Sequence, residues 1–167
     1  MVGGNQVQVV GGPFSVETQE QMDLSAQYVS AAGCQLMRGG AFKPRTSPYT
    51  LQGNGEEGLK MFRKAADKYN LRIVTVSMDA RKVETFRKYD DEIIQIGTRS
   101  MQHFEYMEAV GPTNKPVIHK SGMPETVCEW DRAAEEIAGS GQQNATQRKP
   151  RIRTLENENR QSRDEPP

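Results

Sequence analysis

The sequence predicts an α/β protein: a partial TIM-type (β/α) barrel of about five βα units, followed by a disordered polar C-terminal tail. Apolar strand-like runs alternate five times with helical patterns, and the connections between them are short. Such alternation is typical of a parallel sheet with right-handed crossovers. Basic residues follow several of these strands, at the end where barrels keep their active sites. We assign residues 1–141 to the partial barrel and residues 142–167 to the tail.

The first elements are marked by turn residues. Residues 6–10 are a valine-containing run that ends at a Gly-Gly-Pro turn, which indicates a strand. Residues 15–32 have a helical pattern, and Gly33 follows at the position that suits a helix C-cap. Residues 34–37 are expected to form the second strand, which leads into a basic loop.

The next two elements differ in their periodicity. Residues 56–69 place Leu59 and Phe62 near one face, which predicts an amphipathic helix. Residues 71–76 are rich in β-branched side chains, which favour a strand.

The remaining elements continue the alternation. Helices are expected at residues 80–89 and 101–110, and short apolar strands at residues 92–96 and 116–119. Residues 124–138 are rich in alanine and glutamate, both of which favour a helix.

A barrel-type sheet explains this pattern better than a doubly wound one. A dinucleotide-binding fold would have GxGxxG after the first strand, and the sequence has no such motif there. A complete barrel needs about 200 residues or more, so the patterned part predicts only a portion of one.

The tail has the composition of a segment that does not fold alone. From residue 142 onward only Ala145, Ile152 and Leu155 are apolar. Residues 145–152 stand where a sixth strand would come, but residues 146–150 within this segment are polar and end in Pro150. Too little apolar surface is available to offset the entropy of ordering, so we expect no stable strand here.

The overall composition excludes several partner classes. Lys and Arg number 22 against 22 Asp and Glu, so no global field attracts nucleic acid or a membrane surface. No run approaches the roughly 18 apolar residues of a membrane-spanning helix. The N-terminus has no feature of a signal peptide, and Cys34 and Cys128 form no CxxC motif. We expect a cytoplasmic protein with no nucleic-acid or membrane partner.

The most informative segment is the basic loop at residues 38–49. It combines fixed cations, hydroxyl groups and a Gly-Gly pair at the end of a predicted strand. Arginine binds phosphate or carboxylate with a planar fork, and lysine does so as a point charge. Taken singly, each cation is most simply a solvated surface charge. Together they indicate a site for a phosphorylated, carboxylated small molecule, and they comprise Arg38, Lys43, Arg45, Arg99 and Lys120.

Five segments resemble motifs of 3-deoxy-7-phosphoheptulonate (DAHP) synthase. They are Gly-Pro-Phe-Ser-Val-Glu at 12–17, the loop at 38–49, Gln-Ile-Gly-Thr-Arg at 95–99, His-Lys-Ser-Gly-Met at 119–123 and Ile-Arg-Thr-Leu-Glu at 152–156. The resemblance covers residues 6–164. It implies an aldolase-type TIM barrel and a transferase that condenses phosphoenolpyruvate with erythrose 4-phosphate, at the entry to aromatic amino acid biosynthesis by the shikimate pathway. The Lys-Pro-Arg-Thr-Ser-Pro-Tyr loop favours this family over the related octulosonate-phosphate synthases.

The resemblance implies a role for each matched residue. Lys43 would be catalytic and would also bind substrate. Phosphoenolpyruvate would contact Arg38, Lys43, Arg99 and Lys120. Erythrose 4-phosphate would contact Arg45 and Thr46 in the Lys-Pro-Arg-Thr stretch.

The sequence also departs from the family pattern. Phe14 stands where most members have a cysteine that binds a divalent metal, and Val76 replaces a third-strand glutamate. The other usual metal ligands lie on the last two strands of the family's barrel, which this sequence does not reach. Residues 149–151 replace a Glu-Arg-Gly motif. We therefore expect no cofactor in this chain, and no metal ligand among His103 and His119.

Two functions remain open from the sequence. The first is DAHP synthase-like condensation, impaired in this chain. The alternative is a non-catalytic partial barrel that binds phosphate esters or needs a partner chain to supply the missing strands. The sequence leaves open whether the chain forms a homo-oligomer.

Overall fold

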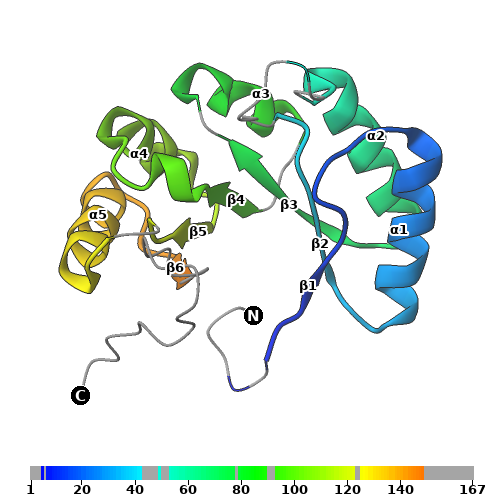
Figure 1. Ribbon diagram of the computed structural model, residues 1–167, viewed down its shortest axis with the longest axis horizontal. Coiled ribbons are helices and arrows are strands. Elements are labelled where there is room, and N and C mark those ends of the chain that lie inside the picture. The colour runs from blue at the N-terminus through cyan, green and yellow to red at the C-terminus, as the bar shows by residue number, and fades with distance from the viewer. Residues whose placement is uncertain are drawn as a thin grey trace.

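The computed structural model describes residues 5, 7–42, 49, 53–77, 79–89, 93–122 and 125–148. Its six strands form a single parallel sheet in the order β1-β2-β3-β4-β5-β6. Figure 1 shows that the sheet curls into an open half-barrel and that the helices cover its convex side. The predicted α/β partial barrel is confirmed.

The elements follow the predicted order along the chain. The strands are β1 (Val10–Gly11), β2 (Leu36–Gly39), β3 (Arg72–Ser77), β4 (Ile93–Ile96), β5 (Val117–Lys120) and β6 (Ala145–Arg148). The helices are α1 (Gln19–Ala31), α2 (Gly55–Lys68), α3 (Val83–Lys88), α4 (Phe104–Val110) and α5 (Val127–Gly139). Short 3-10 turns are η1 (Ala80–Lys82), η2 (Thr98–Ser100) and η3 (Gly111–Thr113).

Side-chain caps determine where α1 and α5 begin. The Thr18 hydroxyl accepts a hydrogen bond from the Gln21 amide at 3.1 Å, so α1 begins after Thr18 and not at residue 15 as predicted. Thr126 and Glu129 cap each other reciprocally at the start of α5. Each such cap stabilises a helix by about 1 kcal/mol. At the other end of α1 the C-cap is Ala32, and Gly33, which we expected at the cap, follows it with a left-handed φ of 75°.

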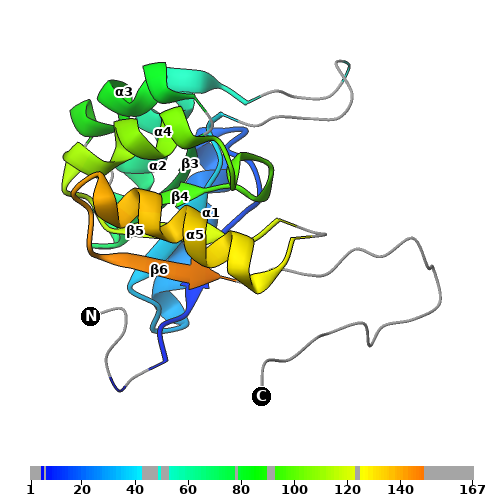
Figure 2. The same cartoon turned by 90° about the vertical axis from the view of Figure 1, so that its left-hand side faces the viewer.

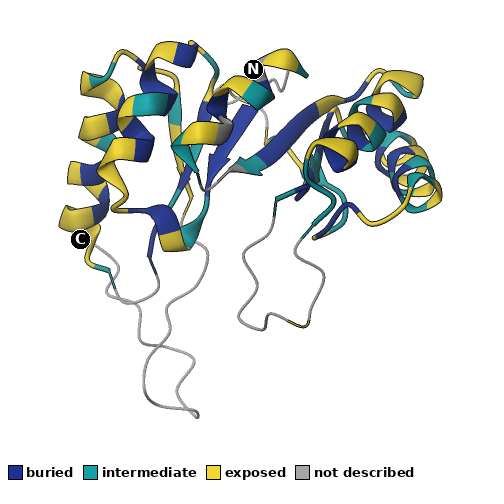
Figure 3. Cartoon of the chain, turned by 90° about the horizontal axis from the view of Figure 1, so that it is seen from above, coloured by how far each residue is buried: buried dark blue, intermediate teal, exposed yellow. Residues whose placement is uncertain are grey.

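The convex face of the sheet carries most of the core. Met37 and Ile73 pack with Phe62 of α2, and all three side chains are fully buried. Farther along the sheet, Ile94 packs with Ile137 of α5 in a second cluster. Figure 3 shows the same pattern, with buried residues along the strands and exposed residues on the outer sides of the helices.

The concave face has a smaller apolar layer. Leu36, Val74 and Ile93 are buried there, and Val10 and Ile118 pack against them. Because successive strand residues alternate between faces, the residues two positions further along β2, β4 and β5 point to this same concave side. Those residues are Arg38, Gln95 and Lys120. The strand alternation thus places polar side chains above an apolar floor.

The sixth strand corrects the sequence analysis. We predicted no stable strand after residue 142, but Ala145–Arg148 pairs in parallel with β5. The strand needs little apolar surface, because it lies at the sheet edge and Ala145 alone packs into the core. The buried Gln142 side chain holds its start, donating to the Lys115 carbonyl at 2.7 Å. Figure 2 shows β6 alongside α5. Pro150 and the rest of the predicted tail, residues 149–167, lie outside the described residues.

Within the ranges given above, no helix is both long enough and apolar enough to span a bilayer.

Candidate functional site

Arg38 and Lys120 lie on the same concave face, at the carboxyl edge of the sheet. Arg38 lies on β2 and Lys120 is the last residue of β5, so β3 and β4 separate them in the strand order. The curl of the sheet offsets this separation, because Arg38 is near enough to lower the pKa of the Lys120 amine. The structure therefore brings together two of the predicted substrate-binding residues.

The electrostatic environment of Lys120 is unusual for a lysine. Partial burial, then Arg148 and then Arg38 lower the pKa of Lys120 from 10.5 to about 8. Burial disfavours the charged form of an amine, and nearby cations add to the effect. A perturbed amine with cationic neighbours in a concave site is a candidate functional group.

The cations lack an acidic counterpart in the part of the chain that the structure describes. The ion pairs there lie on helices and their connections, as in Lys60–Glu57 and Lys88–Glu56, and none involves Arg38 or Lys120. Among the described residues, no carboxylate contributes to the pKa shift of Lys120 either. A ligand with a phosphate or carboxylate group would supply the missing negative charge.

Gln95 adds a neutral polar group to the same face. It lies on β4, between the strands that carry the two cations, and its side chain is only 6% exposed. Its amide offers both a donor and an acceptor to a ligand on the concave face. Gln95 lies in one of the family motifs, from which no role was predicted for it.

Gly12 controls how closely the chain after β1 approaches the site. Its φ is 123°, and a β-carbon at this position would lie 2.3 Å from the Arg38 carbonyl oxygen. Only glycine allows this contact without a shift of the backbone. The Gly-Gly-Pro turn thus helps to fix the backbone that carries Arg38.

Of the other predicted site residues, the structure describes only Arg99. Arg99 follows β4 on η2, at the same edge of the sheet, and is exposed to solvent. Lys43, Arg45 and Thr46 lie outside the described residues. The binding roles of all four stay predictions.

Arg148 is a cationic neighbour of Lys120 that the sequence did not single out. It is the last residue of β6, and its Cα is paired in register with that of Lys120. We discounted its segment because its neighbours are polar. If residues 145–148 form a strand, the alternation of its side chains places Arg148 on the same face as Thr146. Thr146 is the register partner of Ile118, so this is the concave face.

The described residues do not fit a metal ion. Phe14, at the position of the family's cysteine ligand, carries no donor atom, and its side chain is 59% exposed. No three His, Cys, Asp or Glu side chains within the described ranges gather where they could hold a metal. His119 is fully buried on the helix side of the sheet, with Nε2 3.3 Å from the Met101 carbonyl oxygen. Burial lowers the pKa of His119.

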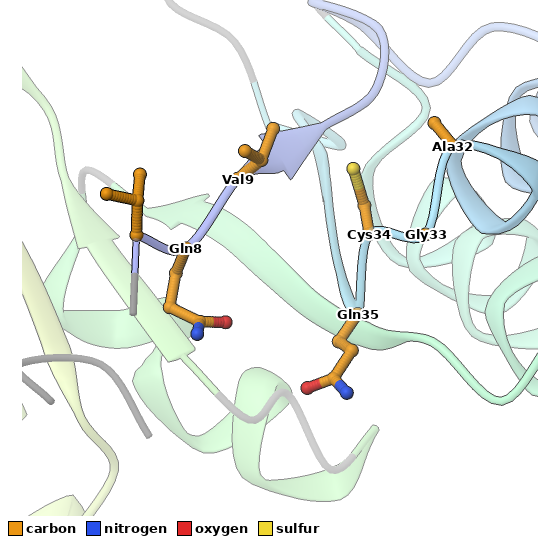
Figure 4. Close-up of a pocket in the computed structure, with 7 residues that line it drawn as sticks. Gln8, Val9, Ala32, Gly33, Cys34 and Gln35 are labelled. Atoms are coloured by element: carbon orange, nitrogen blue, oxygen red, sulfur yellow. The ribbon is translucent and has the colours of Figure 1, made fainter. Parts of the chain in front are cut away.

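A shallow pocket of about 210 Å³ lies at the opposite ends of the strands. Figure 4 shows it between Gln8 and Val9, before β1, and the connection from α1 to β2 that contains Cys34 and Gln35. Its lining has no charged side chain. The pocket therefore offers no counterpart to the cations at the carboxyl edge.

Comparison with known proteins decides the family. A sequence model of the DAHP synthetase I family matches residues 1–164. The chain belongs to the DAHP synthetase I family. The resemblance drawn from the loop at residues 38–49 and the strand-end motifs is thereby confirmed.

Individual relatives agree with this family. The chain is 40% identical over 163 residues to a phospho-2-dehydro-3-deoxyheptonate aldolase of Thermotoga maritima, a match that covers 98% of this chain and 48% of the relative. It is 29% identical over 136 residues to a 2-dehydro-3-deoxyphosphooctonate aldolase of Fusobacterium nucleatum, covering 77% of this chain and 48% of that protein. The chain thus spans about half the length of the curated relatives it matches.

Solved structures of DAHP synthetase I relatives support the fold. The crystal structure of the Thermotoga maritima DAHP synthase matches with a TM-score of 0.87 and 40% identity, over 94% of this chain and 46% of that one. A truncated form of the synthase from the same organism matches with a TM-score of 0.78 and 37% identity, over 89% of this chain and 53% of that one. The half-barrel described above corresponds to part of these larger folds.

Proposed function

We propose that this chain binds phosphoenolpyruvate on its concave face and is a 3-deoxy-7-phosphoheptulonate synthase-like protein in which the condensation with erythrose 4-phosphate is impaired. The observation that carries the proposal is the convergence of Arg38 and Lys120 above an apolar floor, without a described carboxylate beside them. Membership of the DAHP synthetase I family supports the same assignment. The step would belong to aromatic amino acid biosynthesis by the shikimate pathway. The two cysteines are free, in keeping with a cytoplasmic location.

The chemistry of the ligand matches the residues. Phosphoenolpyruvate carries a phosphate and a carboxylate on one small enol. Arg38 has a planar fork for a two-oxygen contact, and Lys120 has a compact charge that can approach the second anionic group. Each charge-assisted hydrogen bond contributes about 1.5–3 kcal/mol. An anion would also relieve the repulsion between the two cations.

Other roles in this proposal rest on the family resemblance alone. Arg99 would hold the phosphate from η2. Lys43 would be the catalytic residue, and Arg45 and Thr46 would bind erythrose 4-phosphate. We assign no metal to the described residues, because Phe14 cannot act as a ligand.

Phe14 favours a second candidate function. Polarising the aldehyde oxygen is commonly the task of a metal Lewis acid, and the phenyl group has no donor for one. The second candidate is therefore a partial barrel that binds phosphate esters without condensing them, or that does so only with another chain. Its binding site would be the same as in the first proposal.

Calorimetric titration with phosphoenolpyruvate at pH 7 and low salt tests the binding site. An open half-barrel leaves the site wet, so we expect a Kd near 1 mM, about −4 kcal/mol, and loss of binding at high salt. Lys120→Gln should weaken binding about tenfold. Lys64→Gln removes the same charge from the exposed face of α2 and should bind as wild type. Equal affinities for Lys120→Gln and wild type would contradict the proposed site.

A condensation assay separates the two candidates. We expect the purified chain to consume no phosphoenolpyruvate with erythrose 4-phosphate, with or without added manganese, because Phe14 replaces a metal ligand. Binding without turnover supports the second candidate. Turnover that is stimulated by manganese and abolished in Lys43→Ala supports the first.

A further inference from the structure

We propose that His119 is a positioning residue for the ligand site: from the helix side of the sheet, its imidazole holds the turn that carries Arg99. The inference rests on the proposed function, in which Arg99 holds the ligand phosphate. His119 is fully buried and lies on the opposite face of β5 from Lys120, so it does not touch a ligand on the concave face. It acts through the backbone that follows β4.

Two contacts join the turn after β4 to the end of β5, and both are made to Met101. This residue directly follows η2 and is buried. Its carbonyl oxygen lies 3.3 Å from His119 Nε2, and its sulfur accepts a hydrogen bond from the Gly122 amide at 2.8 Å. Arg99 precedes Met101 by two residues, and Lys120 follows His119 directly. The Met101 contacts therefore fix the backbone of one predicted ligand residue relative to that of the other.

The surroundings of His119 determine which ring nitrogen carries the proton. A carbonyl oxygen can only accept, so Nε2 donates to Met101. Burial lowers the pKa of His119, so the ring is neutral at pH 7 and Nδ1 bears no proton. Both nitrogens thus have a defined state, and only Nε2 takes part in a contact that the structure describes.

The other nitrogen indicates that His119 does more than fill space. Nδ1 is buried and has no hydrogen-bond partner among the described residues. An unpaired buried acceptor destabilises a fold, so packing alone favours an apolar side chain at this position. An apolar residue could not supply the Nε2 hydrogen bond to Met101. That hydrogen bond is therefore the feature that a histidine adds here.

The η2 turn has few bonds of its own to keep Arg99 in place. The Ser100 amide donates to the Gly97 carbonyl at 2.9 Å, and the His103 amide donates to the Ser100 carbonyl at 3.2 Å. A single 3-10 turn has poor hydrogen-bond geometry, so its position depends on what it is attached to. A turn that is already held loses less freedom when its side chain binds a ligand, which favours binding.

Substitutions at His119 test the hydrogen bond. His119→Leu removes the unpaired acceptor but leaves the Met101 carbonyl without its donor, so these two effects on stability oppose each other and the urea midpoint should change little. Phosphoenolpyruvate should nevertheless bind about three- to tenfold less tightly at pH 7 and low salt, followed by NMR titration. His119→Gln keeps a side-chain donor and should restore most of the affinity. Binding as weak in His119→Gln as in His119→Leu would overturn the proposal.

Trp130→Phe is the matched control. It also removes a buried polar atom that has no partner among the described residues, the Trp130 Nε1 group of α5. It leaves the donor and the acceptor of the His119–Met101 contact unchanged. This variant should bind phosphoenolpyruvate as wild type does. A loss equal to that of His119→Leu would show that general packing of the helix layer, and not the hydrogen bond, controls binding.

A double variant separates positioning from a general effect on the fold. If His119 acts through Arg99, His119→Leu should cause no further loss of affinity when Arg99→Gln is already present. A merely structural role would weaken binding by the same factor in both backgrounds. That second result would contradict the proposal.

NMR of the ligand-free protein tests the hold on the turn by itself. The nitrogen signals of His119 should show a protonated Nε2 and an unprotonated Nδ1. The Ser100 and His103 amides should exchange faster in His119→Leu than in wild type or His119→Gln. A proton on Nδ1, or amide exchange that His119→Leu leaves unchanged, would overturn the proposal.

The inference and the proposed function fail in different ways. If wild type binds phosphoenolpyruvate and Arg99→Gln weakens binding but His119→Leu does not, only the role of His119 is wrong. If wild type does not bind phosphoenolpyruvate, the proposed function is wrong. In that case, faster Ser100 exchange in His119→Leu still supports the hold of His119 on the turn, and unchanged exchange overturns it.

Discussion

Arg38 and Lys120 lie on strands that are not neighbours, yet the Arg38 guanidinium contributes to the lowered pKa of Lys120. A flat parallel sheet would hold residues of β2 and β5 three strand spacings apart, about 14 Å. The curl of the half-barrel shortens this separation on the concave side. The site is therefore a product of sheet curvature as well as of residue type.

Ligand binding should depend on pH through Lys120. Its pKa is about 8, so the amine is charged at pH 7 and largely neutral at pH 9. We expect phosphoenolpyruvate affinity to fall as the pH rises through 8, measured by calorimetry between pH 6.5 and 9.5. Lys120→Gln should have a weak and flat profile over the same range. A wild-type profile that is flat through pH 8 would show that Lys120 does not hold the ligand.

The stability of the ligand-free protein should show the opposite dependence. The folded pKa of about 8 lies below the ordinary value of 10.5, so between these values the unfolded chain binds more protons at Lys120. The contribution of Lys120 to the free energy of unfolding therefore increases as the pH rises from 8 to 10.5. Urea unfolding of wild type and Lys120→Met at pH 7.5 and 10 measures the difference. The free energy of unfolding of wild type, taken relative to that of Lys120→Met, should be higher at pH 10 than at pH 7.5.

Gly12→Ala should damage both the fold and the site. The added β-carbon would lie 2.3 Å from the Arg38 carbonyl oxygen, and the φ of 123° already disfavours alanine. We expect a loss of about 2–3 kcal/mol in the free energy of unfolding, and weaker phosphoenolpyruvate binding. Gly33→Ala is the matched control, because its φ is also positive but nothing lies within 4 Å of the added carbon. That control should cost about 1 kcal/mol and leave binding unchanged.

Phe62→Ala should test the core beneath β2. Phe62 is fully buried on α2 and packs with Met37 and Ile73. Removing its ring should cost about 3–5 kcal/mol of the free energy of unfolding, measured in urea. Leu24→Ala removes an apolar side chain that is 52% exposed on α1 and should cost less than about 1 kcal/mol. Similar losses for both variants would mean that α2 does not pack on the sheet as described.

Glu56 should contribute to the acid sensitivity of the fold. It accepts hydrogen bonds from Lys88 at 2.8 Å and from Tyr89 at 2.6 Å, and these contacts lower its pKa from 4.5 to about 2. Its contribution is present above pH 4.5 and is lost as the pH falls toward 2. Glu56→Gln should therefore be less sensitive to pH in this window, followed by circular dichroism. An acid transition that is unchanged in Glu56→Gln would show that this contact does not link α2 to α3.

The sequence predicted β2 to β5 to within two residues, because apolar and β-branched runs define them physically. The sixth strand was not predicted, because it depends on a tertiary anchor: Gln142 and Ala145 hold a strand whose own composition is polar. Because no sixth strand was predicted, Arg148 was not among the candidate site residues either. The close contact of Gly12 with the Arg38 backbone was equally hidden, since a Gly-Gly-Pro turn does not tell which strand it meets.

The sequence pattern and the family motifs both predicted the cations of the site. Arg38 and Lys120 belong to a sequence whose charges balance, but each stands at the end of a predicted strand and in a matched motif. The lowered pKa of Lys120 could not be predicted in the same way. It depends on burial and on two cations from other strands, which only the folded chain brings together.

A double-mutant cycle on phosphoenolpyruvate binding tests the central claim most directly. Calorimetry at pH 7 and low salt would compare wild type, Arg38→Gln, Lys120→Gln and the double variant. If both residues hold one ligand, each single change should weaken phosphoenolpyruvate binding about tenfold. The affinity of the double variant should fall by less than the product of the two single factors, because the effects of residues that share one ligand are coupled. Independent effects that multiply, or no effect of either change, would contradict the account in which Arg38 and Lys120 form one site.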